Sequence, residues 1–234
     1  MNFLDVNFLY MALMLLCLSY PLLKSFETKI KFFTKSKYIF PSIFFMMLLF
    51  IPWDIYFTSK NVWSFNDDLI LGYKFCLLPI EEWLFFIIIP FCCFFIHEVL
   101  LYFFPKNNIR IQRSVYYLLS VVVLIIAIFY KSNLYSFYVF LLSSILLFLS
   151  ALIGQLFVNN LIRTFLVSLI PFIIVNGILT GSFNSSVVLY NSDEIINLRI
   201  LQIPVEDFFY CFSMISLTMI PYQYLNNKFN VHQF

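Results

Sequence analysis

Two acidic pairs, each following a proline, are the residues of this sequence best suited to moving protons. Residues 79–82 read Pro-Ile-Glu-Glu and residues 204–207 read Pro-Val-Glu-Asp. Two carboxyl groups held together in an apolar pocket tend to divide their roles, one staying protonated as an acid and the other ionised as a base. The repeated pairs therefore predict acid–base catalysis, and the candidates are Glu81, Glu82, Glu206 and Asp207.

The composition places these carboxyl groups in a membrane protein. Of the 234 residues, 62% are hydrophobic and 11% are charged, whereas soluble domains are about 25% charged. An ionisable side chain within a membrane span costs about 2.5–3.5 kcal/mol on insertion scales, so it is rare and usually functional. An acidic pair at a helix start is most often a solvated cap, but the repetition with proline and aromatic residues argues against that interpretation here.

Apolar windows long enough to cross a bilayer, which takes roughly 17–25 residues, recur along the whole chain. They predict an all-α polytopic membrane protein with about seven transmembrane helices. The windows are Phe3–Leu23, Tyr38–Phe57, Leu77–Phe104, Ser114–Tyr130, Leu134–Ile153, Leu161–Leu179 and Pro204–Leu225. The loops Thr58–Cys76 and Thr180–Ile203 leave room for structured turns, and we expect both on the same side.

The lysines and arginines near the predicted helix ends are unevenly distributed. One side holds Lys24, Lys29, Lys31, Lys35, Lys37, Lys106, Arg110, Arg113, Arg163 and Lys228, and the other holds Lys60, Lys74, Lys131 and Arg199. Because cytoplasmic loops carry the excess of positive charge, we expect a multi-pass protein of the cell membrane with its N-terminus outside and its C-terminus in the cytoplasm.

The two motifs belong to a longer internal repeat. Trp53-Asp54, at the end of the second window, corresponds in place to Val175-Asn176, at the end of the sixth. The first three helices thus resemble the last three, and a linking helix keeps the two halves parallel in the membrane. We expect a first three-helix repeat at 1–104, a linking helix at 105–133 and a second three-helix repeat at 134–234, with the four carboxyl groups around one cavity.

Residues near the acidic pairs are expected to support the chemistry. Proline suits the first helical turn, where free amides and the helix dipole favour a carboxylate, and the faces of aromatic rings stabilise a carbocation. The supporting or substrate-lining candidates are Asp54, Asn176, Trp53, Trp83, Pro79, Pro204 and Phe208. His97-Glu98 lies about 15 residues, or roughly 22 Å, along the helix from Glu82, and we expect it to be structural.

Other classes of membrane protein fit the sequence less well. A retinal-binding photoreceptor needs a lysine midway along the last helix, but Lys228 lies beyond it. An iron-dependent desaturase needs a cluster of histidines, and the histidines are His97 and His232 alone. A non-catalytic assembly protein stays open, and so does a proton-coupled transporter, although the carboxyl groups lie at one face and not at the midplane.

The motifs resemble those of the membrane-integral lycopene cyclases, which occur as heterodimers of two small three-helix subunits or as a fused chain. Leu77–Phe86 and Trp53-Asp54 look like the first subunit, and Gln202–Phe209 looks like the second. The resemblance covers essentially the whole chain, by motif at these places and by hydropathy and helix count elsewhere.

This resemblance implies cyclisation of the acyclic ends of lycopene to β-ionone rings, by protonation, ring closure through a carbocation and proton loss. The family pattern maps onto Pro79, Glu81 and Glu82 and onto Pro204, Glu206 and Asp207. Asp207 stands where the first half has Glu82, and Asn176 stands where it has Asp54. The halves are therefore not equivalent catalysts, and the identity of the proton donor stays open. Another enzyme acting on carotenoid ends is the nearest alternative.

Cofactors and partners are inferred from the same features. The 4 glycines form no dinucleotide-binding fingerprint, and the 5 cysteines have no metal-binding spacing. We predict no flavin, nicotinamide or metal. The expected partners are the lipid bilayer and lycopene or a similar apolar polyene, with other carotenoid-pathway enzymes as further candidates and no nucleic acid.

Overall fold

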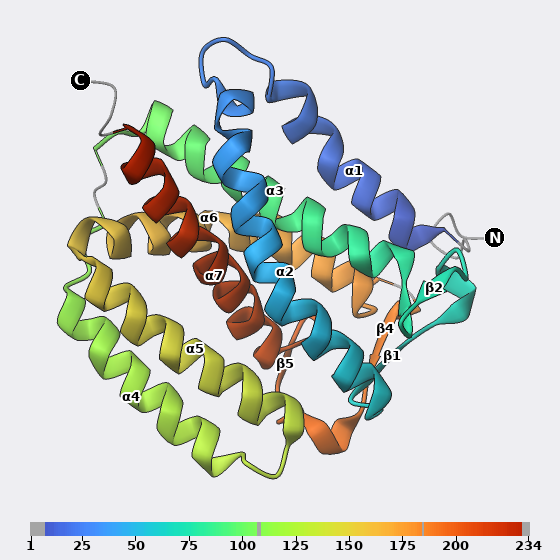
Figure 1. Cartoon of the computed structure of the whole chain (residues 1–234). Helices are drawn as coiled ribbons and strands as arrows, with labels where there is room; N and C mark the ends of the chain where they lie inside the picture. Colours follow the sequence, from blue (N-terminus) through green and yellow to red (C-terminus); the bar gives the residue numbers. More distant parts are fainter. Residues whose placement is uncertain (1–7, 107–108, 184, 231–234) are drawn as a thin grey trace.

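Long apolar helices lying side by side make up most of the structure (Figure 1). The computed structural model describes residues 8–106, 109–183 and 185–230. Within these ranges the helices are α1 (Leu9–Lys24), α2 (Ser36–Ser59), α3 (Ile80–Phe103), α4 (Arg113–Phe129), α5 (Leu134–Ile153), α6 (Gln155–Leu179) and α7 (Val205–Asn230). A short 3-10 helix, η1 (Phe32–Lys35), runs directly into α2.

Four helical segments of the described chain are long and apolar enough to cross a membrane. They are Phe32–Ser59, α3, α5 and α6, whereas α1 and α4 are shorter apolar helices. Long apolar helices of this kind are what a membrane protein requires. The helical fold class is thus confirmed, while the count of seven membrane spans stays a prediction.

The two long loops contain short strands that the sequence windows did not show. The first loop holds β1 (Trp63–Phe65), η2 (Asp67–Leu69), β2 (Lys74–Phe75) and β3 (Leu78–Pro79). The second holds β4 (Val188–Tyr190), η3 (Ser192–Glu194), β5 (Arg199–Ile200) and β6 (Ile203–Pro204). Both loops therefore have the same order of elements.

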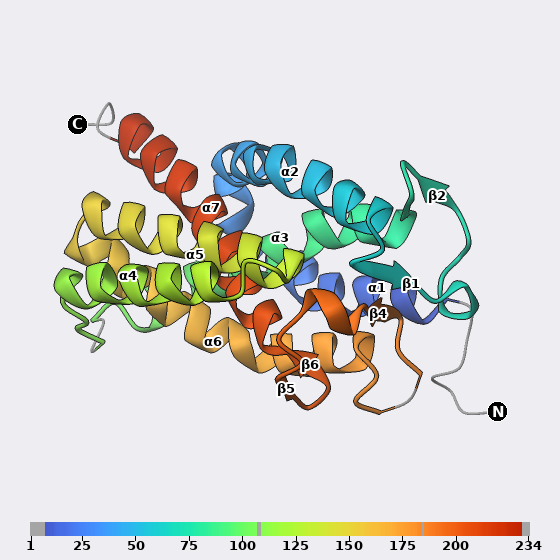
Figure 2. The same cartoon turned by 90° about the horizontal axis from the view of Figure 1, so that it is seen from below.

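Antiparallel pairing joins the two loops to each other. β1 pairs with β4, and Trp63 stands opposite Tyr190, while β2 pairs with β3 and β5 pairs with β6. Figure 2 shows the β1–β4 pair between the two hairpins, at one end of the helix bundle. We call this end, where α3 and α7 begin, the strand end.

Each motif proline ends a strand immediately before a helix, one residue earlier than the expected first helical turn. Pro79 pairs with Lys74 in the β2–β3 hairpin, and its φ of −61° and ψ of 152° are extended. Pro204 pairs with Arg199 in the same way. Because proline has a fixed φ and no backbone N–H, it suits this change from strand to helix, and the acidic pair follows in the first turn of each helix.

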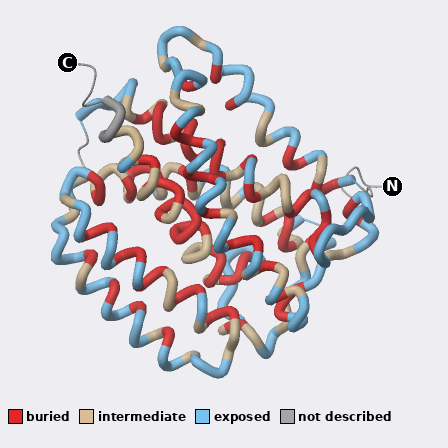
Figure 3. Tube along the Cα trace, viewed as in Figure 1, coloured by how far each residue is buried: buried red, intermediate tan, exposed pale blue. Residues whose placement is uncertain are grey.

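The helices of the two halves interleave. α1 packs on α3 and α5 packs on α7, while α2 also contacts α7 and α3 also contacts α6. The buried residues gather in this central region, and α4 lies at the edge along α5 with its outer side exposed (Figure 3). Exposed large hydrophobic side chains such as Leu118 and Phe129 suit a face covered by lipid.

The sixth helix begins at Gln155, earlier than the window Leu161–Leu179 predicts. Its first turns are polar because they bind the chain that leads into α4: Gln155 Oε1 accepts from the amide of Arg113 at 3.2 Å, and Asn159 Oδ1 accepts from that of Ile111 at 3.2 Å. The start of the first window, residues 3–7, lies outside the described residues.

Gly154 is the single residue between α5 and α6, with φ at 145° and ψ at 168°. This backbone region is essentially restricted to glycine and costs other residues on the order of 1–3 kcal/mol. We predict that Gly154→Ala lowers the free energy of unfolding by about that amount, and thermal unfolding of the purified protein measures it. Leu152→Ala, at a 54% exposed helical position, is the control, and equal melting temperatures for the two variants would contradict the prediction.

Candidate functional site

A cavity of about 440 Å³ lies among α1, α3, α6 and α7, a volume typical of ligand pockets. Along α3 its wall runs from Glu82 to Leu100, which corresponds to roughly 27 Å of helix. Most of the wall is apolar, whereas three acidic side chains and one amide gather at the strand end: Asp54, Glu82, Asp207 and Asn176. The cavity therefore suits an elongated apolar molecule with one end near carboxyl groups.

The first half contributes two neighbouring carboxyl groups. Glu82, in the first turn of α3, accepts a hydrogen bond of 2.6 Å from the Tyr10 hydroxyl of α1. Asp54, near the end of α2, accepts one of 2.7 Å from the Trp63 indole N–H. Both side chains line the cavity and interact electrostatically with each other, and they are 1% and 8% exposed.

The second half contributes one carboxyl group with neutral donors around it. Asp207, in the first turn of α7 and 4% exposed, accepts from the hydroxyls of Tyr135 at 2.7 Å and Tyr190 at 2.9 Å and from the Asn176 amide at 2.8 Å. Burial, followed by the charge of Asp207, raises the pKa of the Tyr190 phenol well above its usual value. Tyr190 therefore remains a hydroxyl donor at neutral pH.

The other member of each acidic pair faces away from the cavity. Glu81 accepts from the backbone amide of Leu71, and Glu206 accepts from that of Ile196, both at 2.7 Å. Neighbouring residues on a helix point about 100° apart, which lets one member of a pair face the cavity while the other faces the preceding loop. The second member of each pair lines the cavity, and the first holds the loop before its helix.

The remaining predicted residues surround this site without lining the cavity: Trp53, Trp83, Pro79, Pro204 and Phe208. Trp53 stacks on Phe50 and meets the ring of Tyr210, which lines the cavity. Trp83 donates to the carbonyl of Phe75 at 3.2 Å and so holds the first hairpin. Phe208 packs edge-on against Phe172, which does line the cavity.

The aromatic hydrogen-bond donors are functional candidates that the sequence did not distinguish. Trp63, Tyr10, Tyr135 and Tyr190 all line the cavity and bind its carboxyl groups. One signal was available, because Tyr10 and Tyr135 are separated along the chain by the same number of residues as Glu82 and Asp207. The donors from β1 and β4 had no such signal, since Trp63 and Tyr190 are not at equivalent positions of their strands.

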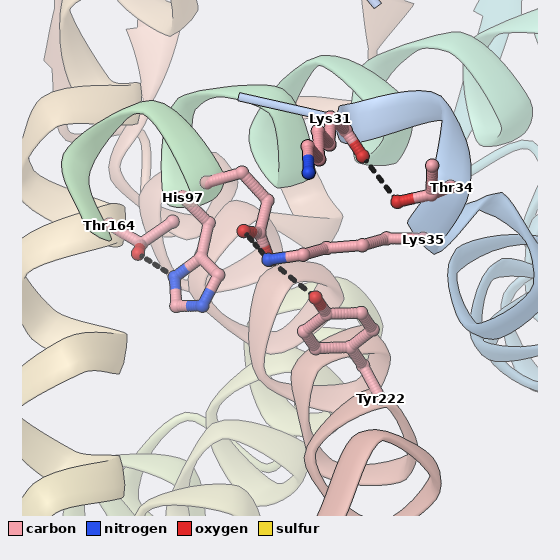
Figure 4. Close-up of polar contacts among 7 residues, drawn as sticks. Lys31, Thr34, Lys35, His97, Thr164 and Tyr222 are labelled. Carbon is pink, nitrogen blue, oxygen red and sulfur yellow. Dashed lines mark hydrogen bonds and ion pairs between the residues drawn. The ribbon is translucent and has the colours of Figure 1, made fainter. Parts of the chain in front are cut away.

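A second polar cluster lies towards the opposite end of α3 (Figure 4). Lys35 forms an ion pair with Glu98, which also accepts from the Tyr222 hydroxyl. His97 contacts the Thr164 hydroxyl at 2.8 Å. These contacts tie the start of α2 and helices α3, α6 and α7 together, away from the acidic end of the cavity. Within the described residues, no group of three or more His, Cys, Asp or Glu is placed to hold a metal ion.

Comparison with known proteins gives matches in both halves. A family model described as lycopene cyclase matches residues 7–100 and again residues 132–225. A bifunctional lycopene cyclase/phytoene synthase of Pyrenophora tritici-repentis (strain Pt-1C-BFP) is 47% identical over 38 residues, which are 16% of this chain and 6% of that protein. The chain thus matches only a small part of that relative's length. No solved structure matches the chain.

The family match includes both acidic motifs and the residues that bind their carboxyl groups. Equivalent positions of its two segments, such as their first residues, are as far apart along the chain as Glu82 and Asp207. Because the family model matches more than half of the residues, the chain belongs to the lycopene cyclase family.

Proposed function

We propose that this protein is a lycopene β-cyclase, which converts the acyclic ends of lycopene to β-ionone rings and so forms γ- and β-carotene. The observation that carries this proposal is the position of Glu82 and Asp207, which come from different halves and line one largely apolar cavity. A long apolar polyene suits the wall along α3, and the carboxyl groups stand where one end of it would lie. The proposal makes the protein an isomerase of carotenoid biosynthesis.

The reaction needs an acid, a base and an environment that tolerates a carbocation. A proton adds to the terminal C=C bond, the resulting cation is attacked by a second C=C bond to close the ring, and loss of a ring proton restores a double bond. No electrons are gained or lost. The rings of Tyr210, Trp63 and Phe85 line the cavity, and aromatic faces attract a cation.

The structure supports different roles for the two members of each acidic pair. Glu82 and Asp207 face the cavity and are the catalytic residues of the proposal. Glu81 and Glu206 accept backbone amides of the preceding loops, so we assign them to positioning. Pro79 and Pro204 set the strand-to-helix change that places both pairs in the first turns of α3 and α7.

We further propose that the protein crosses the membrane seven times as two parallel three-helix repeats, residues 1–104 and 134–234, joined by a linking helix at 105–133. The equal order of elements in the two long loops and the doubled family match support this arrangement. The charge distribution favours an outer N-terminus and a cytoplasmic C-terminus. The substrate then enters from the bilayer, in which it dissolves.

We predict that Glu82→Gln and Asp207→Asn each lower the yield of cyclic carotene by about 10²- to 10⁴-fold, the usual contribution of a general acid or base. Glu81→Gln and Glu206→Gln keep a carbonyl oxygen for the amides of Leu71 and Ile196 and should retain a much larger share of activity. Pigment chromatography of lycopene-accumulating cells that express each variant measures the yields.

Equal amounts of each variant in the membrane fraction are the control for folding. Unchanged lycopene with the intact, correctly inserted chain would reject the cyclase function. Full activity of both Glu82→Gln and Asp207→Asn would instead reject this site.

A second prediction concerns the apolar part of the cavity. Cys92 lines it beside Cys17, whereas Cys76 is exposed in the first hairpin. Because a misplacement of about 1 Å can cost about 10²-fold in rate, Cys92→Phe should lower the yield of cyclic carotene at least about tenfold, while Cys76→Phe leaves it nearly unchanged. The same pigment assay tests this, and equal yields from the two variants would exclude this cavity as the substrate site.

A further inference from the structure

The two halves place different partners beside their cavity-facing carboxyl groups. Glu82 faces Asp54, a second carboxyl group, whereas Asp207 faces Asn176, an amide. Tyr10 and Tyr135 donate to these carboxyl groups from equivalent positions of α1 and α5. The chemical difference between the halves is therefore concentrated at Asp54 and Asn176.

The burial of Asp54 beside Glu82 requires that this pair holds a proton. Oδ1 of Asp54 accepts the Trp63 N–H, but its Oδ2 receives no hydrogen bond from any N–H or hydroxyl donor in the described part of the protein. Asp54 and Glu82 are both buried and line the same end of the cavity, so one of these two neighbouring carboxyl groups must carry a proton. Neither takes part in the ion pairs formed among the described residues, and two adjacent buried charges without a cation are strongly disfavoured.

Asp207 has the opposite surroundings. Its two oxygens accept from Tyr135, Tyr190 and Asn176, and hydrogen bonds donated to a carboxylate favour the ionised form. The Asn176 NH2 group can only donate, so it cannot share a proton with Asp207 as Asp54 does with Glu82. The second half therefore presents to the cavity a carboxyl group whose hydrogen-bond partners all favour its acting as a proton acceptor.

We infer that the Asp54–Glu82 pair is the proton donor that starts cyclisation and that Asp207 is the base that ends it. This inference rests on the proposed function. The pair's proton forms a new C–H bond at the terminal double bond. After ring closure Asp207 takes a proton from the ring, and the electrons of that C–H bond become the new C=C bond. The proton then returns from Asp207 to the pair across the cavity that both line, so nothing is consumed.

Asp54 thereby becomes a catalytic residue and not a supporting one. Tyr10 and Trp63 are positioning residues of the donor, and Tyr135, Tyr190 and Asn176 are positioning residues of the base. Each ring closure needs the donor pair of the first half and the base of the second half. The carboxyl groups of both halves accordingly lie at the same end of one cavity.

Infrared difference spectroscopy of the purified, substrate-free protein tests the donor directly, because a protonated carboxyl group has a C=O stretching band that shifts in D2O. We expect Asp54→Asn and Glu82→Gln each to remove such a band and Asp207→Asn to leave it in place. Asp54→Asn should also lower the yield of cyclic carotene by about 10²- to 10⁴-fold.

The double variant Asp54→Asn with Asn176→Asp moves the second carboxyl group from Glu82 to Asp207. We expect it to restore a protonated-carboxyl band, now sensitive to Asp207→Asn. A restored band would show that Asp54→Asn removes the shared proton and does not unfold the protein. Equal melting temperatures of the variants and the intact protein check folding independently.

A band that persists in Asp54→Asn, or that disappears equally in Asp207→Asn, would overturn the assignment even if the intact protein makes cyclic carotene. Absence of cyclic carotene from the intact protein would instead overturn the proposed function, whatever the spectra show. The two failures are therefore distinguishable.

Discussion

The antiparallel pairing of β1 with β4 is the interaction on which the acidic end of the cavity depends. It places Trp63 opposite Tyr190, and these two side chains donate to Asp54 and Asp207. A slip of one residue would turn every side chain of a strand to the other face. Backbone hydrogen bonds beyond the strands fix the register, since Asn66 donates to Val187 at 2.8 Å and Asn191 donates to Val62 at 2.9 Å.

The cost of burying polar groups explains the contacts around the carboxyl groups. In each half a tyrosine hydroxyl binds the cavity-facing carboxyl group, and a loop amide binds its neighbour. The repeated loop also has an asparagine, Asn66 or Asn191, whose side chain accepts the amide two residues ahead. The halves thus share one framework, and their functional difference lies in a few side chains.

Much of the candidate site can be predicted from sequence because charge is rare in this chain. Glu82, Asp207, Asp54 and Asn176 all stand out against apolar surroundings, and all four line the cavity. Which member of an acidic pair faces the cavity depends on helix rotation, which the motif alone does not determine. The repeat arrangement and the membrane orientation stay predictions.

The aromatic donors and the strand pairing were harder to predict. With 15 tyrosines and 32 phenylalanines in the chain, no single aromatic residue is conspicuous. β1 and β4 are three residues each and far apart in sequence, so neither has a recognisable pattern before it pairs. The apolar pattern alone predicts too late a start for α6, because its polar first turns bond to Ile111 and to Arg113 at the beginning of α4.

The single elongated cavity has a consequence for a molecule with two reactive ends. Its carboxyl groups stand at one end and its wall extends along α3 to Leu100, so a long chain is held with one end at the carboxyl groups and the other far from them. Under the proposed function, each binding event closes one ring. The molecule must then leave the cavity and bind again in the opposite orientation before the second ring can close. The one-ringed species is then a free intermediate that competes with unreacted chains for entry. The ratio of one-ringed to two-ringed product is set by substrate supply and by escape into the surrounding lipid, and not by a second site.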